Sequence, residues 1–133
     1  MTIRRVTSPA APEPPPERWS NCLLADGIAY VAGMVARGDD PKDLAGKDEY
    51  EQAKVIFTKI KGLIEAAGGT MADVVKIIVY VTNIKNNTKV WAARREFFKG
   101  NFPVSTLVQV AALASPEILV EIEAIAHIGK GAR

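Results

Sequence analysis

Two carboxylates on one predicted strand are the residues of this chain best suited to chemistry. Polar and apolar residues alternate over Val120–Ala126, so Glu121 and Glu123 share one face with Ile125 and the remaining residues share the other. A carboxylate in a cleft can orient or activate a water molecule for hydrolysis. The pattern alone is explained equally well by a half-solvated strand with exposed carboxylates.

A serine on a second predicted strand is the other candidate. Within Phe102–Val110, the side chains of Ser105, Leu107 and Gln109 fall on one face. The hydroxyl of Ser105 can donate a hydrogen bond to a bound molecule. Without further information this segment is an amphipathic strand preceded by an ordinary turn.

The other potentially reactive side chains do not form any of the common catalytic motifs. His127 is the only histidine and closes a strand, a position typical of a surface or interface residue. Cys22 is the only cysteine and lies in an apolar run, which favours an inert, packed thiol. No Cys/His cluster, phosphate-binding loop or dinucleotide motif is present, so we expect neither a metal site nor a cofactor.

Net charge and composition argue against nucleic acids and membranes as binding partners. The 133 residues carry 17 basic and 15 acidic side chains, a net charge of +2, which does not favour a nucleic-acid surface. No apolar run approaches the length of a membrane span, and the N-terminus lacks the pattern of a signal peptide. We therefore expect a cytoplasmic protein with no membrane partner.

The elements that would position these residues follow from periodicity. Asp26-Gly27 between the apolar runs 22–25 and 28–32 predicts a β-hairpin. Apolar residues spaced by three and four predict a helix over about 48–67, ended by Gly68-Gly69.

The second half of the chain predicts three strands and a shorter helix. The β-branched run 74–81 is typical of a central strand covered on both faces. A helix over about 90–98 precedes strands at 104–110 and 118–127. Because two helices cannot cover both faces of such a sheet, we expect them on one face and another subunit on the other.

The N-terminal region has a different composition. Five prolines fall within residues 8–17, which favours an extended, solvated arm. We therefore divide the chain into a proline-rich arm, 1–18, and a single domain, 19–133.

Several short segments occur together in an order that identifies a family resemblance. They are Gly33 after a hydrophobic strand, Glu65-Ala66-Ala67-Gly68-Gly69, Asp73-Val74-Val75-Lys76, Val79-Tyr80-Val81, Phe97-Phe98, Phe102-Pro103 and Val120–Ala126. In this series the chain resembles the Rid (YjgF, or endoribonuclease L-PSP) family of reactive-intermediate deaminases. The resemblance covers nearly all of the chain after Arg18.

The resemblance implies an α+β, chorismate mutase-like fold: a mixed six-stranded sheet with two helices on one face, assembled as a homotrimer. It also implies a small-metabolite site in a cleft between subunits. Typical members of the family hydrolyse enamine and imine intermediates such as 2-aminoacrylate. An arginine holds the substrate carboxylate, and a glutamate positions the attacking water.

Carried over residue by residue, the glutamate falls on Glu121 and the cleft glycine on Gly33, but the arginine position falls on Ser105. A serine cannot supply a guanidinium charge, so we expect little or no activity on 2-aminoacrylate. Catalytic roles are then expected for Glu121 and Ser105. Ligand-binding roles are expected for Trp19, Gly33, Trp91 and Leu107.

Three functions remain open. The first is hydrolysis of a different, less acidic or more aromatic imine. The second is a non-catalytic trimer that binds a small molecule or a protein, and the third, least favoured, is RNA cleavage. An arginine that reached the cleft from position 37, 94 or 95 would return carboxylate substrates to consideration.

Overall fold

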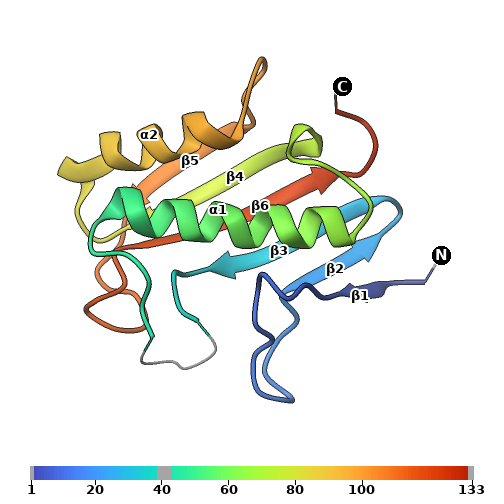
Figure 1. The fold of residues 1–133 in the computed structure, drawn as a ribbon, viewed down its shortest axis with the longest axis horizontal. Coiled ribbons are helices and arrows are strands. Elements are labelled where there is room, and N and C mark those ends of the chain that lie inside the picture. Colours follow the sequence, from blue (N-terminus) through green and yellow to red (C-terminus); the bar gives the residue numbers. More distant parts are fainter. Residues whose placement is uncertain (1, 39–42, 132–133) are drawn as a thin grey trace.

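The computed structural model describes residues 2–38 and 43–131. One mixed sheet has the strand order β1-β2-β3-β6-β4-β5, and both helices lie on the same side of it (Figure 1). The strands are β1 (Arg4–Val6), β2 (Cys22–Ala25), β3 (Ile28–Met34), β4 (Val74–Val81), β5 (Val104–Gln109) and β6 (Val120–His127). The helices are α1 (Glu49–Ala66) and α2 (Asn87–Phe97), with short 3-10 turns η1 (Met71–Asp73) and η2 (Ile84–Asn86). The predicted α+β fold is confirmed.

Local sequence signals set the first hairpin and the long helix. Asp26 and Gly27 both have positive φ, 52° and 77°, as a two-residue hairpin turn requires. The Asp48 carboxylate caps α1 by accepting the backbone N–H of Glu51 at 2.9 Å. Gly68, at φ 95°, follows the helix and allows the chain to turn back.

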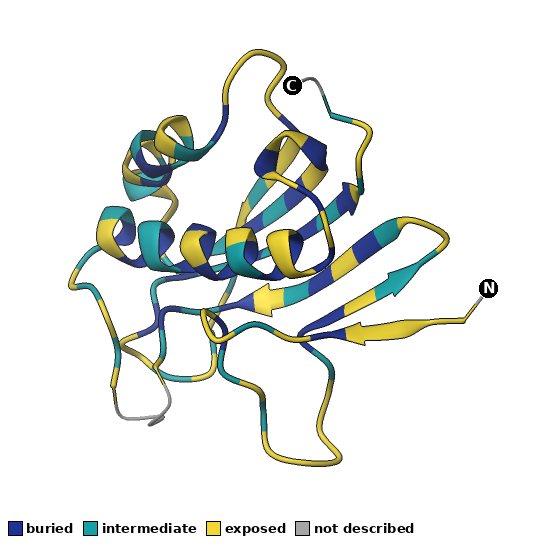
Figure 2. Ribbon diagram, turned by 45° about the vertical axis from the view of Figure 1, so that its right-hand side comes forward, coloured by how far each residue is buried: buried dark blue, intermediate teal, exposed yellow. Residues whose placement is uncertain are grey.

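The two faces of the sheet differ in their cover. The helix-covered face is apolar and buried along β3, β4 and β6, as the dark segments in Figure 2 indicate, whereas β5 at the sheet edge has no buried residue. The opposite face, here called the open face, is covered by nothing in the single chain. In β4 only alternate residues are buried, so this strand is covered on one face and not on both as its composition predicted. Aliphatic and aromatic residues on the open face account for the difference, since they include Ile78 and Tyr80.

The N-terminal segment is built into the fold. Its strand β1 pairs with β2 at the sheet edge, and Ala11 is buried. Gly62 of α1 gives the segment room, because a Cβ at that position would lie 2.6 Å from the Cβ of Ala10. Residues 4–11 are therefore packed against the domain, in contrast to the solvated arm that the prolines suggested.

None of the helices formed by residues 2–38 and 43–131 is long and apolar enough to cross a membrane.

Candidate functional site

A glycine and a glutamate on adjacent strands make the most closely fitted contact of the candidate site. The pairing of β3 with β6 is irregular between Val31 and Met34, and Gly33 lies within that irregularity. The Glu121 side chain covers Gly33: a Cβ there would lie 2.8 Å from Glu121 Cδ and 3.1 Å from Cγ. Only a glycine accommodates the carboxylate in this position.

The two carboxylates of β6 have different partners. Tyr80 of β4 donates its hydroxyl hydrogen to Glu123 Oε1 at 2.5 Å. Within the described part of the chain, the Glu121 carboxylate makes no side-chain hydrogen bond. Burial, and secondarily the nearby charge of Glu123, raise the pKa of Glu121. A carboxyl group with a raised pKa is a stronger base than an ordinary glutamate and is suited to exchange a proton with a bound water.

Trp19 is anchored near the same end of β3. Its indole N–H donates to Asn21 Oδ1 at 3.2 Å, and the Asn21 carbonyl accepts the backbone N–H of Ala32 at 2.8 Å. The indole is 54% exposed, so an apolar surface is available beside the Gly33 end of the strand. We call Trp19, Gly33 and Glu121 the Glu121 cluster.

A second cluster lies between α2 and the edge strand β5. Arg94 Nη1 donates to Ser105 Oγ at 3.0 Å. Trp91 precedes Arg94 by three residues, so the two lie on the same side of α2. Leu107 follows Ser105 by two residues, so these two lie on the same face of β5. We call Trp91, Arg94, Ser105 and Leu107 the Arg94 cluster.

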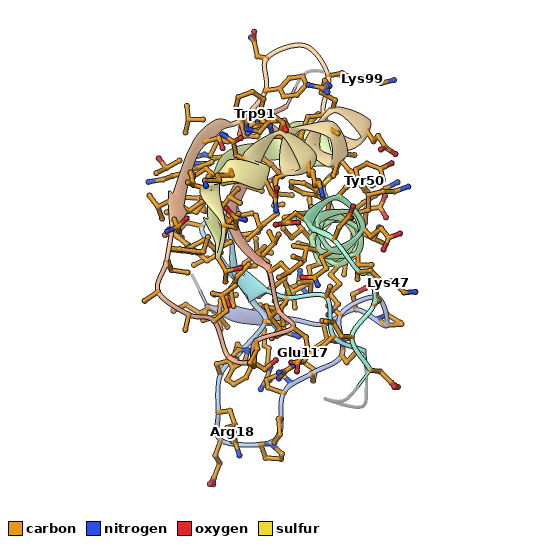
Figure 3. All side chains as sticks on the ribbon, turned by 90° about the vertical axis from the view of Figure 1, so that its left-hand side faces the viewer. Arg18, Lys47, Tyr50, Trp91, Lys99 and Glu117 are labelled. Carbon is orange, nitrogen blue, oxygen red and sulfur yellow. The ribbon has the colours of Figure 1, made fainter. Side chains whose placement is uncertain are left out.

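The two clusters do not meet within one chain. Ser105 pairs with Ile77, whose side chain is fully buried beneath the helices, so Ser105 lies on the helix-covered face. Glu121 pairs with Tyr80 on the open face. Ser105 and Glu121, which lie on strands that follow each other in the sequence, are not on neighbouring strands of the sheet, because β5 pairs with β4 and leaves β4 between β5 and β6. Figure 3 likewise shows Trp91 and Arg18, the residue before Trp19, at opposite ends of the molecule.

The remaining candidates are distributed elsewhere. Arg37 donates to Ser115 Oγ at 2.9 Å, and Arg95 is exposed on α2, so Arg94 alone of the three arginines reaches Ser105. His127 is exposed at the end of β6. Burial raises the pKa of Cys22 to about 11, which agrees with the expected inert thiol.

One positioned side chain was not anticipated from the sequence. Lys59 lies on the buried side of α1, and its ammonium group donates to the carbonyls of Val35, at 2.7 Å, and of Arg37. Burial lowers the pKa of Lys59. This contact ties the segment after Gly33 to α1. The signal was a lysine at the spacing of the apolar stripe, three residues after Ile56.

Two hollows in the described part of the chain contain no residue of either cluster. One of about 510 Å³ is formed by the end of α2 and η1, and one of about 230 Å³ lies on the open face. The first is lined chiefly by Met71, Val74, Phe97, Phe98, Lys99 and Asn101; the second is lined by Lys76, Ile78, Glu123, Ala124 and Ile125. Among the described residues, no group of three His, Cys, Asp or Glu side chains could hold a metal ion.

Comparison with known proteins decides the family. The family model described as Endoribonuclease L-PSP matches residues 9–128. This chain belongs to the endoribonuclease L-PSP family, the Rid or YjgF family. The matched range contains both clusters and every strand except β1.

Solved structures of the Rid family share the fold over almost the whole chain. A protein of unknown function from Pseudomonas aeruginosa is 41% identical, with 96% of this chain and 94% of that chain covered at a TM-score of 0.88. The Rid-family protein YyfA from Yersinia pestis is 30% identical, with 96% and 100% covered at a TM-score of 0.87. RidA from the Antarctic bacterium Psychrobacter sp. is 28% identical, with 94% and 99% covered at a TM-score of 0.84.

Proposed function

We propose that this Rid-family chain is a homotrimeric hydrolase of imines or enamines, with its site in a cleft between subunits. The observation that carries the proposal is the Glu121 carboxylate held over Gly33, half-buried and with a raised pKa. Among the described residues the carboxylate has no side-chain partner, and it keeps its position only because residue 33 has no side chain. Both features are expected of a catalytic group.

The open face supports the assembly. It presents aliphatic and aromatic side chains that no element of the single chain covers, with Val104 exposed by 66% and Tyr30 by 48%. Such a contiguous surface is typical of an interface between subunits. An interface is also what would unite the two clusters, because Glu121 and Ser105 lie on opposite faces of one chain.

The proposed reaction uses Glu121 as general base and then acid. Glu121 accepts a proton from water as the water oxygen bonds to the imine carbon, and the imine nitrogen takes a proton. That proton comes from Glu121, which passes on the one it took from water. Glu121 then takes the hydroxyl proton of the carbinolamine and gives it to the amine, so that the C–N bond breaks, ammonia leaves, the carbonyl forms and Glu121 is again ionised. Ser105 would hydrogen-bond the substrate, the backbone at Gly33 would approach it, and Trp19, Trp91 and Leu107 would form apolar walls.

Hydrolysis of imines generated in solution tests the proposal. We expect the wild-type protein to accelerate release of the carbonyl product, and Glu121→Gln to lower the rate by about a hundredfold or more. Glu65→Gln, which neutralises an exposed carboxylate on α1, is the matched control and should retain full activity. Equal rates for the wild type and Glu121→Gln would contradict the proposed role of Glu121.

A non-catalytic trimer that binds a small molecule is the second candidate. The exposed indoles of Trp19 and Trp91 favour it, since both offer apolar surface for binding without acid–base chemistry. Wild-type binding of a small molecule at the Glu121 cluster with no hydrolysis of any imine would select this alternative.

RNA cleavage, which the family description names, receives less support from this chain. Its net charge is +2 and its one histidine, His127, lies outside both clusters. We propose a cytoplasmic location, because the lone cysteine is a buried thiol that forms no internal disulfide.

A further inference from the structure

Arg94 carries a positive charge for which the described part of the chain provides no carboxylate. Its Nη1 bonds to Ser105 Oγ, and its Nε is buried without a hydrogen-bond partner. Lysines 54 and 89, by contrast, each lie within 4 Å of a carboxylate oxygen. A partly buried guanidinium is costly unless an anion compensates it.

The burial of the Arg94 guanidinium also indicates that it would be stabilised by an anion. Removal from water, and then repulsion from Arg95, lower the pKa of Arg94. Arg94 nevertheless contacts β5, through its hydrogen bond to Ser105. Its surroundings are therefore those of a group that gains stability when an anion arrives.

We propose that Arg94 and Ser105 together bind the carboxylate of an anionic ligand. The inference rests on the proposed function, because the Arg94 cluster is taken to be one side of the cleft. A guanidinium offers several N–H donors in one plane, and the Ser105 hydroxyl adds a further donor at 3.0 Å from it. The charge that Ser105 cannot supply on β5 is delivered from α2.

The position of the charge also bears on ligand size. Because the guanidinium comes from the helix, no long side chain extends from position 105 toward Leu107 and Trp91. Both neighbours are apolar, and Trp91 is 39% exposed. The cluster therefore suits an acid with a branched or aromatic side chain, such as a 2-imino acid larger than 2-aminoacrylate.

Calorimetric titration with a stable product acid tests the inference. The probes are 2-oxo-4-methylpentanoate and its neutral amide. We expect the wild type to bind the acid about tenfold or more tightly than the amide, and Arg94→Gln to lose that preference. Arg95→Gln removes the same charge from the adjacent exposed position and should keep the preference. Equal binding of acid and amide by the wild type, or an unchanged preference in Arg94→Gln, would overturn the inference.

Three further variants allow the inference to be tested even if Arg94→Gln does not fold. If Arg94→Gln is poorly folded by circular dichroism, Ser105→Ala and Arg94→Lys should each reduce the preference for the acid severalfold; an unchanged preference in both overturns the inference. Glu121→Gln should bind the acid normally while hydrolysing no imine. Arg94-dependent binding in a wild type without hydrolytic activity would refute the proposed function alone. Hydrolysis of acidic and neutral imines that is insensitive to Arg94 would refute the inference alone.

Discussion

The Glu121 cluster and the Arg94 cluster differ in charge, in the face they occupy and in what holds them. The Glu121 carboxylate lies on the open face and depends on the missing side chain of Gly33. The Arg94 guanidinium lies between α2 and β5 and depends on a hydrogen bond to Ser105. One cluster is built by backbone clearance within the sheet, and the other by a long side chain reaching across from a helix.

This difference is informative about assembly. A two-fold interface pairs the same surface with itself, which would set like charges against each other. The two different clusters meet when each subunit presents its Glu121 cluster to the Arg94 cluster of the next, with the proposed ligand site between them. Such head-to-tail contacts close into a ring when the rotation permits, and a trimer is the ring expected from the family resemblance.

A substitution that prevents assembly, and so keeps the two clusters apart, should have the largest effect on hydrolysis. Val108→Asp places a charge on the open face in the row of Tyr80 and Glu121, at a side chain that is 40% exposed in the single chain. We expect a folded monomer by light scattering, with hydrolysis reduced to the uncatalysed rate, because burying an unpaired charge opposes assembly.

Ile84→Asp is the control, since Ile84 is 41% exposed and lies outside the open face. It should leave the trimer and its activity intact. A fully active Val108→Asp monomer would show that the clusters need not be joined.

Filling the space under Glu121 tests the Glu121 cluster alone. In Gly33→Ala the new methyl group forces the carboxylate to move, so we expect a fall of about a hundredfold in hydrolysis with the trimer retained. Gly38→Ala, whose added Cβ would make an ordinary 3.6 Å contact, should be active. Adding Gly33→Ala to Glu121→Gln should cause little further loss; a multiplicative loss would mean that the two residues act separately.

Moving positive charge onto β5 tests the Arg94 cluster. The wild type should hydrolyse 2-aminoacrylate at least about a hundredfold more slowly than an arginine-bearing family member, because no guanidinium extends from position 105 to hold the carboxylate of so small a substrate. Ser105→Arg should raise that rate by about tenfold. Wild-type turnover already equal to that of an arginine-bearing member would refute the importance of this position.

The smallest effect concerns the pH dependence of stability. Because the pKa of Glu121 is raised in the folded protein, the folded state retains a proton that the unfolded chain has released. Stability should therefore fall as pH rises from the ordinary glutamate pKa through the raised value, and level off above it. Glu121→Gln should lack this fall and be more stable at neutral pH by less than about 1 kcal/mol, since Glu121 is half-exposed and screened.

Urea unfolding of both proteins at matched concentration, at pH 4 and pH 7, measures the difference. The exposed-site variant Glu65→Gln should follow the wild type. A Glu121→Gln protein that lost stability between these pH values as the wild type does would place the responsible group elsewhere.

The sequence predicted the fold because local signals and tertiary packing agree. The turn residues Asp26 and Gly27, the cap Asp48 and the apolar stripe of α1 each encode their element within a few residues. Strand order is not local in this sense. Nothing within residues 118–127 indicates that the last strand inserts between β3 and β4, which separates Glu121 from the strand that carries Ser105.

The site was predictable in part for the same reason. Alternation placed Glu121 on the correct face of β6, and Gly33 and Glu121 do meet across adjacent strands. The pairing of Arg94 with Ser105 depends on how α2 lies across β5, which no periodicity specifies. Arg94 was one of three arginines that the sequence could not distinguish, and the side-chain geometry separates them.

The contact between Gly33 and Glu121 also constrains how this lineage can change. Any residue larger than glycine at position 33 would displace the Glu121 carboxylate from its present position, so substitutions at the two sites are coupled. A descendant that acquires a side chain at 33 must first, or at once, shorten or redirect residue 121. Gly33 and Glu121 should therefore be inherited together. Family members that lack both residues would be expected to lack the proposed catalytic role of the carboxylate.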